Sequence, residues 1–192
     1  MLTGRSNQVW TEVWDTGRAI LIAIIVALLV RQFVVKTYQV SGISMQPTLQ
    51  SGERLLVNRF IYRFSAPQIG QVVVLHPPLP TSEDFVKRIV ALPGETFVMR
   101  NGQVYVDGHL QPEPWEPRAW RDHFTGSRYV QGPQGNLVVD SQAIRVPAGM
   151  VWVLGDHRAV SEDSRYFGPV PITSLRGLVF LIWWPLPDFR AL

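Results

Sequence analysis

From Lys36 to the carboxyl terminus, the chain is a series of short apolar runs separated by glycine, proline and asparagine. Runs of this length are typical of strands and too short for most helices. No long helical periodicity occurs in this part of the sequence. The pattern therefore predicts a mostly β domain with an antiparallel sheet, and its candidate strands lie at 54–58, 71–76, 85–92, 96–100, 103–106, 136–139, 150–154 and 178–183.

Two dipeptides predict tight turns within this domain. Asn101-Gly102 separates two candidate strands, which is a strong signal for a two-residue hairpin, and Asp107-Gly108 indicates another turn. Proline, glycine and arginine are frequent from 112 to 135. We therefore expect one domain over 37–192 with a small irregular or β insertion at about 107–147.

The domain is preceded by an unbroken apolar run at 19–30, which Arg31 interrupts and 33–35 resume. A membrane-spanning helix needs about 20 apolar residues. If 33–35 are included, the run is long enough for a short membrane span, provided that the charged end of Arg31 extends to the membrane interface. The sequence predicts a membrane anchor at 18–36 and a short amino-terminal segment at 1–17.

Two other interpretations of this run remain. A buried core helix would alternate apolar and polar faces, whereas this run is apolar on all sides. A cleaved signal segment usually ends at an Ala-x-Ala-like site, and no alanine occurs between Ala27 and Ala66. Small residues such as Ser41 and Gly42 leave cleavage open, but the sequence favours an uncleaved anchor.

The overall composition excludes several function classes. The 192 residues carry a net charge of only +3 and no dense basic run, so nucleic-acid binding is not expected. The absence of cysteine excludes disulfides, thiolate metal sites and a cysteine nucleophile. No His-x₃-His spacing indicates zinc. With only four histidines, a serine–lysine pair is the simplest hydrolytic machinery available to the chain.

Ser44 and Lys87 are the candidates for such a pair. Gly42 permits a tight turn before Ser44, which can bring backbone amides near a reacting carbonyl. On a strand over 85–92, Lys87 and Arg88 point to opposite faces, so one of them faces apolar surroundings if both faces are buried.

Desolvation could leave the Lys87 amine neutral near pH 7 if it lowered the pKa by about 3 from its usual value of about 10.4. The alternatives are a lysine in solvent on an edge strand and a serine in an ordinary turn.

A third polar segment, GDHRAVSEDSR at 155–165, follows an apolar strand. Its hydroxyls, carboxylates and arginines could orient a catalytic amine and brace the site through an Asp–Arg pair. A polar surface turn is the other interpretation. His157 is not assigned a role.

These segments together resemble the bacterial type I signal peptidases. The matching blocks are SGISMQPTL at 41–49, GERLLV at 52–57, GQVVV at 70–74, VKRIVALPGE at 86–95 and GDHR with SEDSR at 155–165. Each block is short, but their order and spacing are highly specific, and the apolar run at 19–30 fits the single anchor of this family.

The resemblance implies a membrane-bound serine endopeptidase that removes signal peptides from exported preproteins by an acyl-enzyme route, without a metal or organic cofactor. Ser44 would be the nucleophile and Lys87 the general base. Ser161 would hydrogen-bond the Lys87 amine, and Asp163, Arg165 and Asp156 would support the site. Gly42 and the Ser44 amide would form the oxyanion hole. Pockets for small residues at −1 and −3 would be lined by Val40, Met45, Leu49, Phe85 and Val86.

By the same resemblance, the partners would be signal peptides and the lipid bilayer. The protein would be a single-pass protein of the cell membrane, with a cytoplasmic amino terminus and an extracytoplasmic catalytic domain. The sequence leaves the oligomeric state open. The two alternative functions are a soluble serine–lysine autoprotease of the stress-response repressor type and a non-catalytic membrane-tethered adaptor.

Overall fold

The computed structural model describes residues 14–26, 34–115, 129–132, 135–138 and 142–192. The chain divides into two units, Met1–Lys36 and Thr37–Leu192. In the first unit, residues 14–26 form a helix whose mostly apolar side chains are exposed. No helix within the described ranges has both the length and the apolar character required to cross a membrane. Residues 27–33 of the predicted anchor lie outside the described part of the chain.

The first strand overlaps the end of the predicted anchor. Strand β1 (Val35–Gln39) already includes the last two residues of the segment predicted at 18–36. The valine, threonine and tyrosine side chains of β1 favour the extended backbone over a helix.

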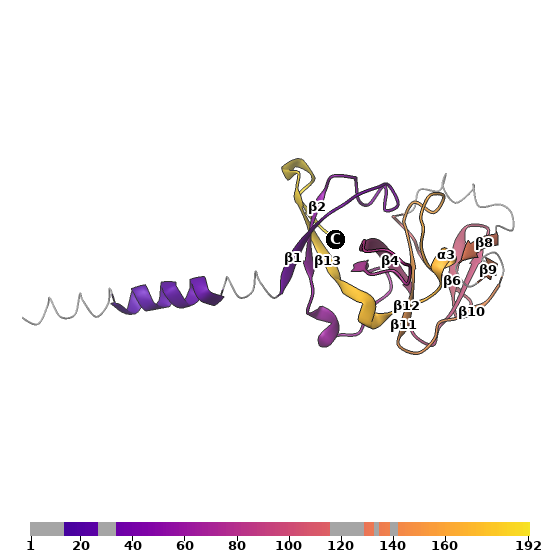
Figure 1. The fold of residues 1–192 in the computed structure, drawn as a ribbon, viewed down its shortest axis with the longest axis horizontal. Helices are drawn as coiled ribbons and strands as arrows, with labels where there is room; N and C mark the ends of the chain where they lie inside the picture. Colours follow the sequence, from indigo (N-terminus) through magenta and orange to yellow (C-terminus); the bar gives the residue numbers. More distant parts are fainter. Residues whose placement is uncertain (1–13, 27–33, 116–128, 133–134, 139–141) are drawn as a thin grey trace, which may run out of the picture. The chain divides into compact units, whose positions relative to one another are not determined.

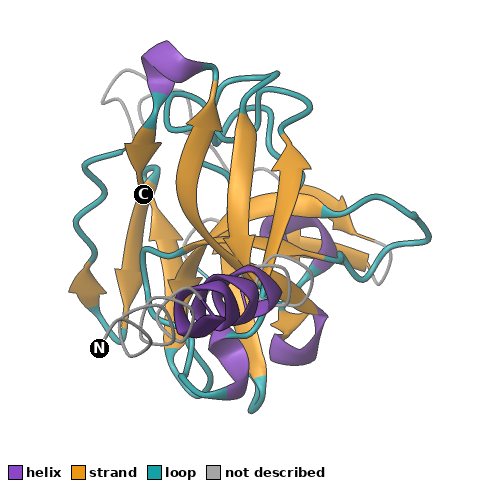
Figure 2. Cartoon of the chain, turned by 90° about the vertical axis from the view of Figure 1, so that its left-hand side faces the viewer, coloured by secondary structure: helices purple, strands orange, loops and turns teal. Residues whose placement is uncertain are grey.

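The second unit is dominated by strands, as Figure 2 shows. Its large sheet has the order β1-β2-β13-β3-β4-β11-β12, with β14 paired to β13. The strands of this sheet after β1 are β2 (Arg54–Asn58), β3 (Val72–Leu75), β4 (Phe85–Ala91), β11 (Met150–Leu154), β12 (Val170–Pro171), β13 (Leu175–Trp184) and β14 (Arg190–Ala191). Every pairing from β2 along the sheet to β12 is antiparallel, as is that of β13 with β14, which confirms the predicted fold class of the domain.

A second sheet has the order β10-β5-β6-β7 and lies beside β11 and β12 (Figure 1). Its strands are β5 (Thr96–Arg100), β6 (Gln103–Val106), β7 (His109–Leu110) and β10 (Ile144–Arg145). The sheet therefore begins before the insertion boundary predicted at 107. Strand β8 (Tyr129–Gly132) pairs antiparallel with β9 (Gly135–Val138) inside the predicted irregular or β insertion, and β9 overlaps the strand predicted at 136–139.

Both predicted turns are confirmed. Asn101 and Gly102 have φ of 49° and 75° and connect β5 to β6, and Asp107 and Gly108 have φ of 50° and 80° and connect β6 to β7. Positive φ at both central residues is the conformation of a type I′ hairpin turn, which explains the Asn-Gly and Asp-Gly pairs. The short helical turns are η1 (Ile61–Arg63), α3 (Ser164–Phe167), η3 (Ile172–Ser174) and η4 (Leu186–Asp188).

The large sheet is buried on both faces at its centre. On β3, Val72 and Val74 pack into one apolar cluster, while Val73 and Leu75 pack into another. On β11, Trp152 and Leu154 pack against the second sheet, and Val151 and Val153 face the opposite way. Because both faces are covered, these strands consist of continuous apolar runs rather than alternating patterns. The strand that carries Lys87 therefore lies in the interior of the domain.

Strand β4 shows the predicted alternation over most of its length. Phe85 and Ile89 pack on one face, and Val86 and Val90 pack on the other. Strict alternation would place Ala91 on the first face, but it packs with Val90 instead. A register shift in the neighbouring strand, between Trp152 and Val153, interrupts the alternation at this point.

Candidate active site

Ser44 lies in the loop between β1 and β2, and its position is held on both sides. Gly42 has φ of +92°, a conformation that favours glycine. Met45 is 2% exposed and packs into the core directly after Ser44. The Ser44 carbonyl accepts a hydrogen bond of 3.0 Å from the His157 amide. The core therefore fixes the backbone of Ser44 while its side chain stays partly accessible.

Lys87 reaches Ser44 from β4. Its Nζ donates a 2.8 Å hydrogen bond to the Ser44 Oγ, and the residue is only 3% exposed. Burial lowers the Lys87 pKa from 10.5 to about 8, against the opposing charge of Asp163 and with the support of the Arg165 charge. A substantial fraction of this amine is neutral in mildly alkaline solution and able to accept a proton. The structure thus brings together the two residues that the sequence suggested as a pair.

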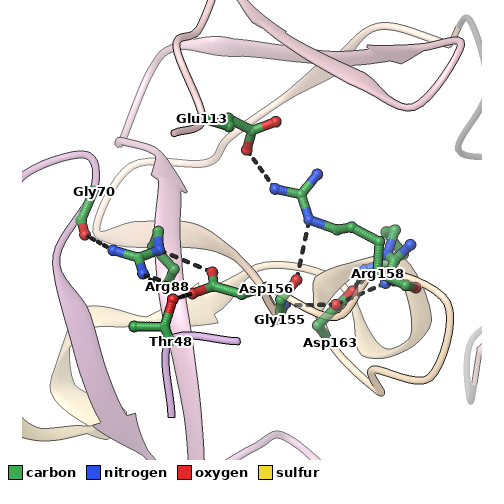
Figure 3. Close-up of polar contacts among 9 residues, drawn as sticks. Thr48, Gly70, Arg88, Glu113, Gly155, Asp156, Arg158 and Asp163 are labelled. Carbon is green, nitrogen blue, oxygen red and sulfur yellow. Dashed lines mark hydrogen bonds and ion pairs between the residues drawn. The ribbon is translucent and has the colours of Figure 1, made fainter. Parts of the chain in front are cut away.

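Arg88, the next residue on β4, has a different environment. Its guanidinium donates hydrogen bonds of 2.9 and 2.6 Å to the two carboxylate oxygens of Asp156 and one of 2.7 Å to the Gly70 carbonyl (Figure 3). Thr48, four residues after Ser44, also donates its hydroxyl to Asp156. The cluster connects the serine loop to β4 and to the turn after β11.

Asp163 and Arg165 form the predicted pair. Asp163 is fully buried and accepts two side-chain hydrogen bonds from Arg165, of 2.8 and 2.9 Å. It also caps α3 and accepts a 2.9 Å bond from the Gly155 amide. Burial alone would raise the Asp163 pKa, but the charge and hydrogen bonds of Arg165 lower it below its usual range. The carboxylate therefore remains ionised and fixes the turn over 155–165.

Ser161 lies against this turn. A Cβ added to Gly155 would be 2.1 Å from the Ser161 Oγ and 2.5 Å from the Ser44 carbonyl oxygen, so only glycine fits between them. The Ser161 Oγ is buried and has no hydrogen-bond partner among the described residues. The bond from Ser161 to the Lys87 amine that the resemblance implies is therefore not formed in this structure, although Ser161 packs beside the Ser44 backbone through Gly155.

An open groove of about 290 Å³ runs past Ser44 and Lys87. Four of the five residues predicted to line substrate pockets face it: Val40, Met45, Phe85 and Val86. Leu49 is not among the lining residues, because it is fully buried in the core beside Met45. The predicted oxyanion residues Gly42 and Ser44 also line the groove. Within the described ranges, no group of three or more histidine, aspartate or glutamate residues could hold a metal ion.

Sequence reasoning missed several residues of the site. It gave Arg88 no partner, although an arginine beside Lys87 on a strand buried on both faces needs a carboxylate. It also missed the buried ion pair between Arg158 and Glu113. Glu113 lies in the region predicted to be irregular, and no local pattern indicates that a distant arginine needs its carboxylate.

A buried amine of lowered pKa, bonded to a serine hydroxyl beside an open groove on a β scaffold, defines a class of site. It is typical of hydrolases that activate a serine with a lysine.

Comparisons with known proteins agree with that class. The model of the family "Signal peptidase, peptidase S26" matches residues 13–184. A probable signal peptidase I-1 of Synechocystis sp. is 34% identical over 183 residues, which cover 92% of this chain and 85% of that protein. A signal peptidase IB of Staphylococcus aureus strain Mu50 is 34% identical over 181 residues, which cover 90% of both chains.

A crystal structure of a signal peptidase I from Enterococcus faecalis V583 is 34% identical and covers 59% of this chain and 97% of its own, with a TM-score of 0.47. The chain belongs to the signal peptidase family, peptidase S26, and is accordingly a hydrolase of peptide bonds.

Proposed function

We propose that this protein is a membrane-bound serine endopeptidase that removes amino-terminal signal peptides from exported preproteins and cleaves after small residues. The observation that carries the proposal is the 2.8 Å hydrogen bond between the Lys87 amine and the Ser44 hydroxyl, both within one groove. Family membership and relatives that match nearly the full chain support the substrate class.

The reaction begins when neutral Lys87 takes the proton of the Ser44 hydroxyl. The oxygen attacks the carbonyl carbon of the scissile bond, and the backbone amides at Gly42 and Ser44 stabilise the resulting oxyanion. The intermediate collapses, the C–N bond breaks, and the Lys87 ammonium gives its proton to the leaving amine. A water molecule then hydrolyses the Ser44 ester with Lys87 again as base, which restores the hydroxyl.

The groove supports a preference for small side chains. Phe85 and Val86 line it as partly buried residues, while Val40 and Met45 belong to the packed core beneath it. A packed wall of this kind leaves little depth, so a large side chain would meet core atoms that cannot move aside without cost. Ser161 would orient the Lys87 amine once the groove is filled.

The apolar segment at 18–36 supports attachment to the cell membrane as a single-pass anchor, with the amino terminus in the cytoplasm and the β domain outside. Attachment would keep the groove near the bilayer surface, where a translocated signal peptide is presented.

The test is cleavage of a model preprotein with an Ala-x-Ala site by the detergent-solubilised protein, followed by amino-terminal sequencing of the product. We expect one new amino terminus directly after the Ala-x-Ala sequence. Ser44→Ala and Lys87→Ala should each lower kcat by at least about 10³-fold, because nucleophile and base act as a unit.

Matched controls are Ser65→Ala, an exposed serine outside the groove, and Lys36→Ala, which changes the only other lysine in the sequence. Both should retain activity. Unchanged cleavage by Ser44→Ala would refute the proposed nucleophile, and no cleavage by the unaltered protein would refute the substrate class.

A further inference from the structure

A short segment outside the large sheet contacts two arginines beside the active site, Arg158 and Arg88. It follows β7 and comprises Glu113, Pro114 and Trp115. Glu113 is 5% exposed although it is charged and lies between two prolines. Because proline fixes its own φ and restricts the residue before it, the sequence Pro112-Glu113-Pro114 limits the backbone conformations open to Glu113.

Each of the two long side chains in this segment contacts an arginine of the site. The Glu113 carboxylate accepts a short hydrogen bond from Arg158, as Figure 3 shows. The ring of Trp115 lies 4.1 Å from the guanidinium carbon of Arg88, a distance typical of a cation–π contact.

Arg158 connects Glu113 to the turn that touches Ser44. Its Nε donates a 3.0 Å hydrogen bond to the Gly155 carbonyl, and its own carbonyl accepts a 2.7 Å bond from Arg165. Asp163 completes the arrangement, since it binds both Arg165 and the Gly155 amide. Gly155 is thus held at its amide and its carbonyl, against the Ser44 carbonyl oxygen.

Arg88 holds the next residue of the same turn, because its guanidinium binds the Asp156 carboxylate through two hydrogen bonds. The two arginines that the segment contacts are therefore the two that hold Gly155 and Asp156.

We infer that the segment from Glu113 to Trp115 is a positioning element of the active site, which acts through Arg158 and Arg88 to hold the turn at 155–156 against Ser44. This inference rests on the proposed function. A guanidinium buried like that of Arg158, which is 2% exposed, requires an anionic partner. Without the Glu113 carboxylate, Arg158 would lose this ion pair and hold the Gly155 carbonyl less firmly.

Release of this turn affects catalysis as well as stability. The Lys87 pKa is lowered mainly by burial, and Val160 and Glu162 of the turn line the groove together with Lys87. A loosened turn admits water to the amine, and the Lys87 pKa rises toward its ordinary value. Substrate affinity should change little, because Glu113 and Arg158 do not line the groove.

The test compares Glu113→Gln with the double variant Glu113→Gln/Arg158→Met, both in the full chain. The double variant removes both buried charges, so it should fold even if the single variant does not. We expect the midpoint of the kcat–pH profile to rise by about one pH unit and kcat at pH 7 to fall about tenfold, with KM within about twofold of the parent.

The matched control is Val104→Ala, a truncation of a 1% exposed residue in the second sheet that has no polar contact with the turn. It should lower Tm without moving the pH midpoint. If the folded double variant kept the parent's kcat and the parent's midpoint of the kcat–pH profile, the inference would be overturned. A double variant that cannot fold would also overturn it, because the segment would then be required for folding. Loss of activity in Ser44→Ala under the same conditions shows that the proposed function stands even if the inference fails.

Discussion

Lys87 and Arg88 are neighbours on one strand, and burial affects them in opposite ways. Lys87 is 3% exposed and can lose its proton, so its pKa falls to about 8. Arginine keeps its charge under all ordinary conditions, so Arg88 is neutralised by Asp156 instead. The same sheet therefore holds an amine that can lose its proton on one face and a permanently charged, ion-paired guanidinium on the other. This division of roles follows from side-chain chemistry, since both residues are almost fully buried.

At the residue scale, the first prediction concerns pH. Only neutral Lys87 can accept the Ser44 proton, so kcat should rise about tenfold per pH unit below pH 8 and level off above it, in line with a pKa of about 8. Steady-state rates with a short Ala-x-Ala peptide from pH 6 to 9.5 measure this, with circular dichroism as a check on folding. A rate that is flat between pH 6 and 8, or a midpoint above pH 10, would contradict a desolvated amine.

A second prediction concerns stability. Because folding lowers the Lys87 pKa from 10.5 to about 8, the unfolded chain binds the extra proton between these values, and stability rises with pH across that window. Below pH 8 the buried charge costs about 3 kcal/mol. Lys87→Met removes this cost but loses a hydrogen bond worth about 1 kcal/mol. It should therefore stabilise the protein by about 2 kcal/mol at pH 6.

That gain should vanish as the pH approaches 10.5. Urea unfolding at several pH values measures it, with Lys36→Met as the control. A variant that is less stable than the parent at pH 6 would show that the amine is not desolvated in the folded protein.

At the scale of elements, the critical contact is between the serine loop and the turn that follows β11. Two segments far apart in the sequence meet where the His157 amide binds the Ser44 carbonyl and where Gly155 separates Ser44 from Ser161. Of the strands that flank these segments, β2 and β11 were predicted from their apolar runs, whereas β1 was not. The Asn-Gly turn and the Asp-Gly turn were also predicted. The short strands β7, β10, β12 and β14 have two residues each, which is too short for any periodicity to reveal.

Gly155→Ala tests this contact. The new methyl group would lie 2.1 Å from the Ser161 Oγ and 2.5 Å from the Ser44 carbonyl oxygen, so one of these groups must move. A displacement near 1 Å at a reacting group lowers the rate by about 10²-fold, and the overpacking should cost about 1–3 kcal/mol of stability.

The measurements are kcat, KM and Tm, with Gly17→Ala as the control, because a Cβ at Gly17 meets nothing within 4 Å. A kcat within threefold of the parent in Gly155→Ala would mean that the turn does not position Ser44.

At the scale of the whole molecule, the three apolar clusters all lie within Thr37–Leu192, between Val40 and Ile182. A domain with its own complete core should fold without the preceding helical segment. Because β1 starts at Val35, the part that folds alone should begin at or before that residue.

Removal of residues 1–33 tests this organisation. We expect the truncated chain to fold with a Tm close to that of the full chain and to cleave a soluble peptide at the same kcat. It should be released from membranes by alkaline extraction, whereas the full chain should resist, because the proposed anchor would insert in the bilayer. Processing of a membrane-embedded preprotein should fall about tenfold or more, since attachment raises the effective concentration of the enzyme. Retention of the truncated chain after extraction would argue against the anchor.

Ser44 and Lys87 were only candidates from their local patterns, and the resemblance to a family gave them their roles. What the amino-acid sequence determined by itself is the local structure: the mostly β domain, two tight turns and the faces of β4 up to Val90. These features depend on side-chain periodicity and on residue types within a few positions, which a single chain displays directly. Only the tertiary structure decided which charged groups are buried together. Arg88 with Asp156, Arg158 with Glu113 and the placement of Leu49 in the core depend on contacts between distant segments, and burial, which sets the Lys87 pKa, exists only once those segments pack.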